Sequence, residues 1–221
     1  MKTLVASLAD NKAALGRRYA EWAVSAPTLE SAVAAAAMAQ DELGHSRSTY
    51  PVLKGLGVDA NEDGFGGDKR LALLDDELPD WNAFIAANLL VDGVLTTFVA
   101  SCVDSSLEPM AARARKILQE EGSHRAHGEA WARRLCRGED RDAFVARLRE
   151  TWEHAGRWLG PDDDAELTAA LQTGEVTRDG PAQRELVRAW LVDLLAAEGV
   201  AIELPELTWE GWDADRRRWQ A

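Results

Sequence analysis

Two copies of one short motif constrain this chain more than any other feature of its sequence. Glu42 and His45 stand three residues apart in one segment that reads as a long helix, and Glu121 and His124 repeat the spacing in another. Residues three apart on an α-helix share a face, so each carboxylate projects beside its imidazole. Two such pairs from two helices are what a carboxylate-bridged two-metal site inside a four-helix bundle requires.

The apolar periodicity along the chain predicts an all-α protein. Leu4, Leu8 and Leu15 recur at helical spacing in the first segment, and Thr28 is a plausible N-cap for the second. Pro51 should kink or end that second helix. We expect long helices over residues 4–24, 29–54, 79–105 and 107–136, and shorter ones over 139–159 and 181–197. Residues 55–78 should form an irregular glycine-rich crossover or lid, and residues 203–221 an extended strap over the bundle or a partner surface.

The bulk properties restrict the class of protein. A length of 221 residues suits one domain, here residues 1–221, with the core bundle over about 4–136 and the extra helices and strap over 137–221. A formal net charge of −13 argues against a nucleic-acid or anionic-membrane binder. Two cysteines form no disulfide framework, the N-terminus lacks a signal-peptide pattern, and the apolar run at 32–39 is too short to span a membrane. A cytoplasmic location is expected.

The candidate ligand set is completed by an acid on the third long segment. Asp92 lies in the middle of an apolar stretch, where a lone carboxylate is costly. An oxygen-rich set with one imidazole per metal suits iron or manganese better than zinc. A buried ion pair without metal is the competing interpretation. The candidate metal ligands are Glu42, His45, Asp92, Glu121 and His124, with the three acids holding and bridging the metals and so serving as the catalytic carboxylates.

Several stretches resemble the phenylacetate-catabolism family of ferritin-like proteins, in particular the α-subunits of phenylacetyl-CoA epoxidase. They are residues 26–29 leading to 40–45, residues 90–93, and residues 120–125, and the likeness covers roughly residues 8–135. The resemblance implies a ferritin-like bundle that carries a di-iron site. It also implies a monooxygenase that epoxidises the aromatic ring of an acyl-CoA with electrons from a reductase.

On motif match, the same resemblance assigns ligand roles to Glu42, His45, Asp92, Glu121 and His124. The family also has a second type of subunit, which keeps the bundle, lacks the full ligand set and acts as a structural partner. A homodimer or a hetero-oligomer with a homologous subunit is therefore expected.

The first helix departs from the pattern of the catalytic subunits. In an antiparallel hairpin turning near residues 26–27, the level facing Glu42 is near residue 12, at a rise of ~1.5 Å per residue. The catalytic subunits place a glutamate there, whereas this chain has Lys12, with Asp10 about half a turn away. Asp10 could replace that ligand, the site could hold metal with five protein ligands and water, or the Lys12 ammonium could neutralise the acids in place of a metal.

Three further side chains lie next to the motif residues. Asp41 and Glu120 precede the ligand acids, point about 100° away on a helix, and are candidates to hydrogen-bond a ligand histidine from another helix. His127 lies one turn beyond His124, and a solvated position is the favoured interpretation over a role in orienting a ligand.

Overall fold

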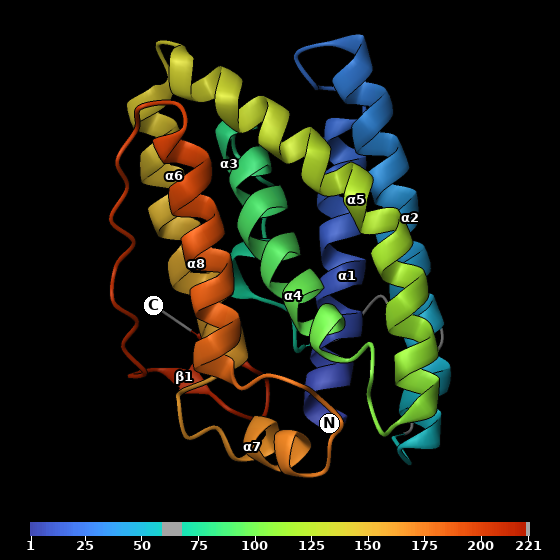
Figure 1. The fold of residues 1–221 in the computed structure, drawn as a ribbon. Coiled ribbons are helices and arrows are strands. Elements are labelled where there is room, and N and C mark those ends of the chain that lie inside the picture. The colour runs from blue at the N-terminus through green and yellow to red at the C-terminus, as the bar shows by residue number, and fades with distance from the viewer. Residues whose placement is uncertain (59–67, 220–221) are drawn as a thin grey trace.

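The computed structural model describes residues 1–58 and 68–219 and confirms the all-α, ferritin-like bundle. Its four long rods are α1, α2, the α3–α4 rod and α5, which lie side by side in Figure 1, with α6 and α8 flanking them. The elements are α1 (Lys2–Trp22), α2 (Leu29–Gly55), α3 (Trp81–Ala86), α4 (Gly93–Ser101), α5 (Glu108–Arg137), α6 (Arg141–Ala155), α7 (Ala165–Gln172), α8 (Gly180–Ala196), β1 (Trp212–Asp213) and β2 (Arg218–Trp219).

Side-chain caps set where the helices begin. Thr28 Oγ1 accepts a hydrogen bond from the Ser31 amide at 3.1 Å, as the sequence predicted. Asp80 Oδ1 does the same for the Ala83 amide at 2.7 Å and starts α3. Pro51 does not end α2, which continues to Gly55.

The first two helices approach each other closely at Gly16. A Cβ atom there would lie 3.0 Å from Leu43 Cγ and 3.1 Å from the Ala39 carbonyl oxygen, so a larger side chain would push α1 and α2 apart. The alanine-rich start of α2 supports the same tight packing. Lys12 lies about one turn before Gly16, and this contact therefore brings the lysine within reach of the α2 carboxylate.

The third rod is not one continuous α-helix, contrary to the sequence prediction for residues 79–105. A buried π-helical turn, Ala87–Asp92, joins α3 to α4. Such turns insert a residue into the helical ladder and often occur at functional sites. The turn ends at Asp92 and packs tightly against α5, where a Cβ on Gly128 would lie 2.0 Å from Asn88 Oδ1.

The same rod is the one stretch of the described residues, Trp81–Ser101, that is long and apolar enough to cross a membrane by length and composition. In the structure 78% of its apolar window is buried inside the protein. The rod is therefore apolar because it is a core helix, packed between α1, α5 and α6.

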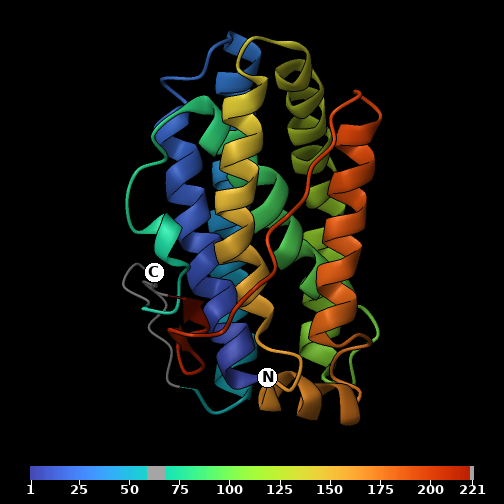
Figure 2. The same ribbon diagram turned by 90° about the vertical axis from the view of Figure 1, so that its left-hand side faces the viewer.

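The C-terminal tail follows a defined path. In Figure 2 the tail runs along the outside of the bundle over α6. Backbone carbonyls of the tail accept hydrogen bonds from α6, including Trp152 Nε1 to Pro205 at 3.2 Å and Arg149 Nε to Glu203 at 3.1 Å. The tail closes with the β1–β2 hairpin, which pairs Trp212 with Trp219 and was not predicted.

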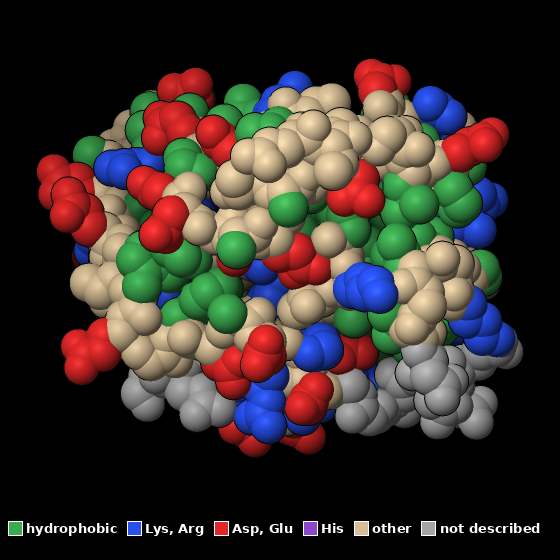
Figure 3. All heavy atoms as spheres, turned by 90° about the horizontal axis from the view of Figure 1, so that it is seen from below, with side chains coloured by type: hydrophobic (Ala, Val, Ile, Leu, Met, Phe, Trp, Pro, Cys, Tyr) green, Lys and Arg blue, Asp and Glu red, His purple; other side chains and the backbone are tan. Residues whose placement is uncertain are grey.

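The end of the bundle near the start of α1 carries a short helix, α7. The helix α7 was not predicted; it starts at the Asp164 cap and packs near the beginning of α1. Seen from this end of the bundle, acidic, basic and hydrophobic side chains are interspersed on the surface (Figure 3). Residues 59–67 of the predicted glycine-rich crossover lie outside the described residues.

Candidate functional site

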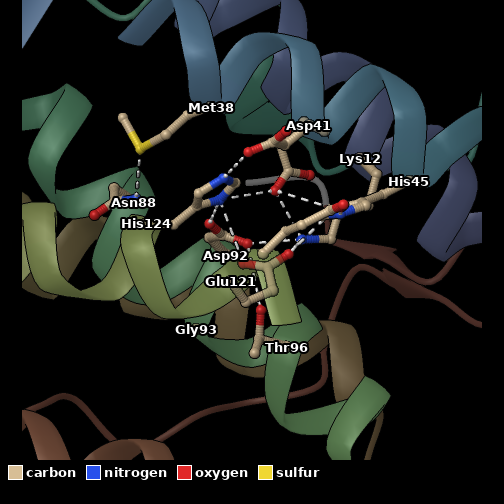
Figure 4. Close-up of polar contacts among 12 residues, drawn as sticks. Lys12, Met38, Asp41, His45, Asn88, Asp92, Gly93, Thr96, Glu121 and His124 are labelled. Atoms are coloured by element: carbon tan, nitrogen blue, oxygen red, sulfur yellow. Dashed lines mark hydrogen bonds and ion pairs between the residues drawn. The ribbon is translucent and has the colours of Figure 1, made fainter. Parts of the chain in front are cut away.

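All four rods of the bundle contribute to one buried polar cluster (Figure 4). The five predicted ligand residues meet there, and Lys12 of α1 joins them. None of the six is more than 4% exposed, in a bundle that is otherwise apolar. The α2 and α5 pairs each face inward from one helix face, as the three-residue spacing predicted, and Asp92 enters from the end of the π-helical turn.

The lysine ammonium lies in the middle of the three carboxylates. Lys12 Nζ is 2.9 Å from Glu42 Oε1, 2.7 Å from Asp92 Oδ1 and 2.6 Å from Glu121 Oε1. These three contacts use the three protons that an ammonium can donate. Because the lysine side chain is fully buried, it has no water to exchange these contacts for.

The two histidines bind the same acids from the other side. His124 Nδ1 lies 3.1 Å from Asp92 Oδ2, 3.3 Å from Glu121 Oε2 and 3.4 Å from Glu42 Oε1. His45 Nδ1 lies 3.3 Å from Glu121 Oε1. The histidines therefore take part in an ion cluster rather than each pairing only with the acid of its own motif.

The outer acids behave as the sequence suggested, and both do so across helices. His45 Nε2 of α2 lies 2.7 Å from Glu120 Oε2 of α5, and His124 Nε2 of α5 lies 3.3 Å from Asp41 Oδ2 of α2. Both acids are about one-third exposed and so connect the buried cluster to the surface. Such partners fix the orientation of an imidazole ring.

The electrostatics favour a charged lysine. Burial by itself would lower the pKa of Lys12, but the negative charges of Asp92, Glu121 and Glu42 outweigh burial and raise this pKa well above its ordinary value. Burial likewise opposes ionisation of Glu121, yet Lys12 and the two histidines hold its pKa well below the usual range. The ammonium and this carboxylate therefore stabilise each other's charged forms.

The pKa values of the two histidines and of Glu42 are also raised by their surroundings. Burial would lower the pKa of His124, but its hydrogen bonds to Asp92, Glu121 and Glu42 raise it well above its ordinary value. The pKa of His45 is also raised, against burial, mainly by its hydrogen bond to Glu121. Burial raises the pKa of Glu42 to about 7, with Asp92 adding to the effect and Lys12 opposing it. Lys12 and the two histidines thus face the three acids.

The acids and one histidine also form a donor set of a kind that could hold a metal ion. One ligand atom from each of Glu42, Asp92, Glu121 and His124 can be chosen so that all lie within 4.8 Å of one another. The ammonium, however, already contacts all three acids of this set, and a divalent ion placed among the same oxygens would be repelled by it at close range. The donors fit a cation, but they do not fit a metal while Lys12 is charged and in place. That the five predicted residues bind metal stays a prediction.

Asp10, the other first-helix acid considered, lies outside this cluster. Its Oδ2 accepts a hydrogen bond from the Lys69 backbone amide at 3.1 Å. Of the three alternatives for the first helix, the geometry corresponds to the one in which the Lys12 ammonium neutralises the acids.

Two neighbours of the cluster were missed by sequence reasoning. Asn88 Nδ2 donates to Tyr19 Oη at 3.2 Å, and the Tyr19 ring stands edge-on to His124 at 6.5 Å between centroids. The position of Asn88 one turn before Asp92 was the available signal. His127 is half-buried: it packs edge-on against Trp81, and its Nε2 atom has no hydrogen-bond partner among the described residues.

The comparisons with known proteins now decide the family. The family model described as phenylacetic acid catabolic protein matches residues 1–221. This chain belongs to that family. Within it, the chain is similar to one of the subunits of 1,2-phenylacetyl-CoA epoxidase from Escherichia coli strain K12, with 25% identity over 197 residues that cover 86% of this chain and 77% of that protein. The resemblance found in the sequence is thereby confirmed at the level of the family.

Proposed function

We propose that this family member is a metal-free structural subunit of an oxygenase that acts on an aromatic acyl-CoA, and that it pairs in the cytoplasm with a homologous catalytic subunit. One observation supports this above the others: the buried Lys12 ammonium contacts all three acids of the donor set. A fixed positive charge there supplies the cation that the acids require, so the bundle can fold without metal. The similarity to a subunit of a multi-subunit epoxidase supports the pairing.

In this function the cluster is structural. Lys12 joins α1 to the three other rods through one charged group, and the histidines join α2 to α5. The subunit would present a rigid bundle to its partner, while the partner would bind the metals and carry out the oxidation with electrons from a reductase.

A second candidate function is favoured by the four-residue donor set itself. If Lys12 withdraws or loses its proton, the acids and histidines could bind iron or manganese, and the chain would then be a di-iron or di-manganese monooxygenase of the same pathway. Its three acids would hold the metals and its histidines would bind one metal each.

Metal content separates the two candidates. The chain, purified without added metal or affinity tag and then reconstituted anaerobically with Fe(II), is expected to retain less than about one-tenth of an iron per chain, because the ammonium repels the ion. The Lys12→Glu variant restores an acid at this position and is expected to retain iron. Lys2→Glu is the matched control, since it makes the same charge change at an exposed position of the same helix.

Elemental analysis and the visible absorption of bound iron read out the result. Two irons per unmodified chain would overturn the structural proposal and support the oxygenase.

The pairing is tested separately by sedimentation of an equimolar mixture with a family member that has a glutamate at the Lys12 position. A stable hetero-oligomer is expected, and two independently sedimenting species would contradict the proposed partnership.

A further inference from the structure

A large cavity lies on the side of the charge cluster that faces α8. Its volume is about 490 Å³, within the range of small-molecule sites. The walls come from the π-helical turn, α4, α5 and α8, and the apolar ones include Leu89, Leu118, Val187 and Trp190. Gly93 and Thr96 border the cavity. Figure 4 shows both residues beside Asp92.

The floor of the cavity is acidic in composition but neutral in charge. Asp92 and Glu121 reach it, yet Lys12 contacts Oδ1 of the former and Oε1 of the latter, while His124 Nδ1 lies near the second oxygen of each. Each floor oxygen is therefore already paired with a cation. A ligand cation would gain little there, and an apolar group can lie against Thr96 and Gly93 without leaving an acid unpaired.

The mouth of the cavity is basic. Arg125 and Arg178 line it. Arg125 is engaged, because its Nε donates to Glu129 at 2.9 Å and its guanidinium lies 4.7 Å from the centroid of the Trp190 ring. The Arg178 side chain makes no hydrogen bond or ion pair with the described residues, although its backbone amide is held by Ser101 Oγ at 3.2 Å. An exposed guanidinium on an anchored stretch of backbone thus lies beside an apolar cavity.

From this arrangement we infer that the cavity binds a small organic acid with one carboxylate, its apolar body lying between Trp190, Val187 and Leu118 and its carboxylate against the Arg178 guanidinium. One free guanidinium matches a monoanion bidentately. A polyphosphate would require more cations than the two arginines that line the cavity. The inferred binding depends on the cavity alone. We also expect the acid to be released chemically unchanged, and this expectation rests on the proposed metal-free function.

The test uses two ligands that differ in a single charged group. Isothermal titration calorimetry of the full chain with 1-naphthaleneacetate is compared with its neutral analogue, 1-naphthaleneacetamide. Because a charged hydrogen bond contributes about 1.5–3 kcal/mol, the acid should bind at least ~10-fold more tightly than the amide. Equal affinities, or no heat with either compound at millimolar concentration, would overturn the inference.

Variants locate the site. Arg178→Gln should reduce the affinity for the acid to that for the amide, while Arg188→Gln, an exposed position of α8 outside the cavity, should leave both unchanged. Ala100→Trp should fill the cavity and abolish binding of both compounds, with circular dichroism checking that it remains folded. If that variant does not fold, the two arginine variants still decide, since equal effects from both would contradict the site.

Mass spectrometry of the recovered acid tests the metal-free function separately from binding in the cavity. Binding followed by recovery of unmodified acid, in the presence of Fe(II), oxygen and a chemical reductant, is the expected result. An oxygenated product would leave the binding site intact and refute the metal-free function. Absence of binding by a chain that also retains no iron would refute the cavity inference alone.

Discussion

Two buried cations hold this molecule together in different ways. Lys12 lies among the four rods and Arg217 lies in the C-terminal tail, and neither side chain is more than 1% exposed. Lys12 contacts three carboxylates. Arg217 contacts Asp164 at 3.1 Å, donates from Nε to the Trp158 carbonyl at 3.0 Å, and is 3.9 Å from Glu166.

The pKa values of the two cations shift in opposite directions. Burial lowers the pKa of Arg217, and the acids near it do not make up the difference. For Lys12 three acids outweigh the same effect. Burial alone therefore does not set the direction in which the pKa of a buried cation shifts. The acids around the cation decide it. Lys12 supplies the positive charge that three buried carboxylates share, whereas Arg217 joins the C-terminal tail to the rest of the protein through a few contacts.

The largest expected effect is that of removing the central charge. Lys12→Met should lower the free energy of unfolding by about 3–5 kcal/mol, because it leaves three buried acids without their shared cation. Urea denaturation with EDTA present measures the change, and the exposed Lys2→Met, expected within about 0.5 kcal/mol of the unmodified chain, is the control. A loss below about 1 kcal/mol for Lys12→Met would show that the acids are not dependent on the ammonium.

Removing the tail cation should cost less and act locally. Arg217→Met should lower the free energy of unfolding by about 1–3 kcal/mol, since the tail can move and let Asp164 reach water. Hydrogen exchange measured by mass spectrometry should accelerate in residues 203–219 and stay unchanged in α1 and α5. The neighbouring, more exposed Arg216→Met is the control, and uniform acceleration over the whole chain would contradict a local role.

The pH dependence of stability sharpens the comparison. An acid whose folded-state pKa lies above its unfolded value stabilises the fold at low pH, and that contribution is lost as the pH rises through the folded pKa. Glu42, with a pKa of about 7 beside Lys12, is such a group. In Lys12→Met its pKa should rise further, so the stability difference between this variant and the unmodified chain should be larger at pH 8 than at pH 5.

Urea titrations at both pH values measure that difference, and Lys2→Met should show none. A difference that is larger at pH 5 would mean that the acids are already protonated in the unmodified chain. That outcome would remove the basis for treating Lys12 as the charge that balances the cluster.

The smallest effect is expected at the edge of the cluster. Glu120→Gln keeps a hydrogen-bond acceptor for His45 but removes a charge that is 38% exposed, so the free energy of unfolding should fall by less than about 1 kcal/mol. The pKa of His45, followed by NMR, should fall because an acid beside it is lost. An effect as large as that of Lys12→Met would show that the outer acids belong to the structural cluster.

The sequence by itself determined the bundle, the inward faces of Glu42, His45, Glu121 and His124, and the place of Lys12 on the facing helix. Helical periodicity and the three-residue spacing are local, so they can be read without coordinates. The outer pairing of Asp41 and Glu120 with histidines was available from the same geometry, because both acids flank a motif residue.

Only the tertiary structure decided between three alternatives for the first helix. Whether Lys12 reaches the acids, or Asp10 replaces it, depends on how closely α1 approaches α2, and Gly16 sets that distance through a contact between segments far apart in sequence. The π-helical turn that aims Asp92 and the cavity beneath it also arise from packing of α4, α5 and α8. Charge neutralisation inside a protein is a sum over neighbours in space, and a linear spacing rule does not contain those distances.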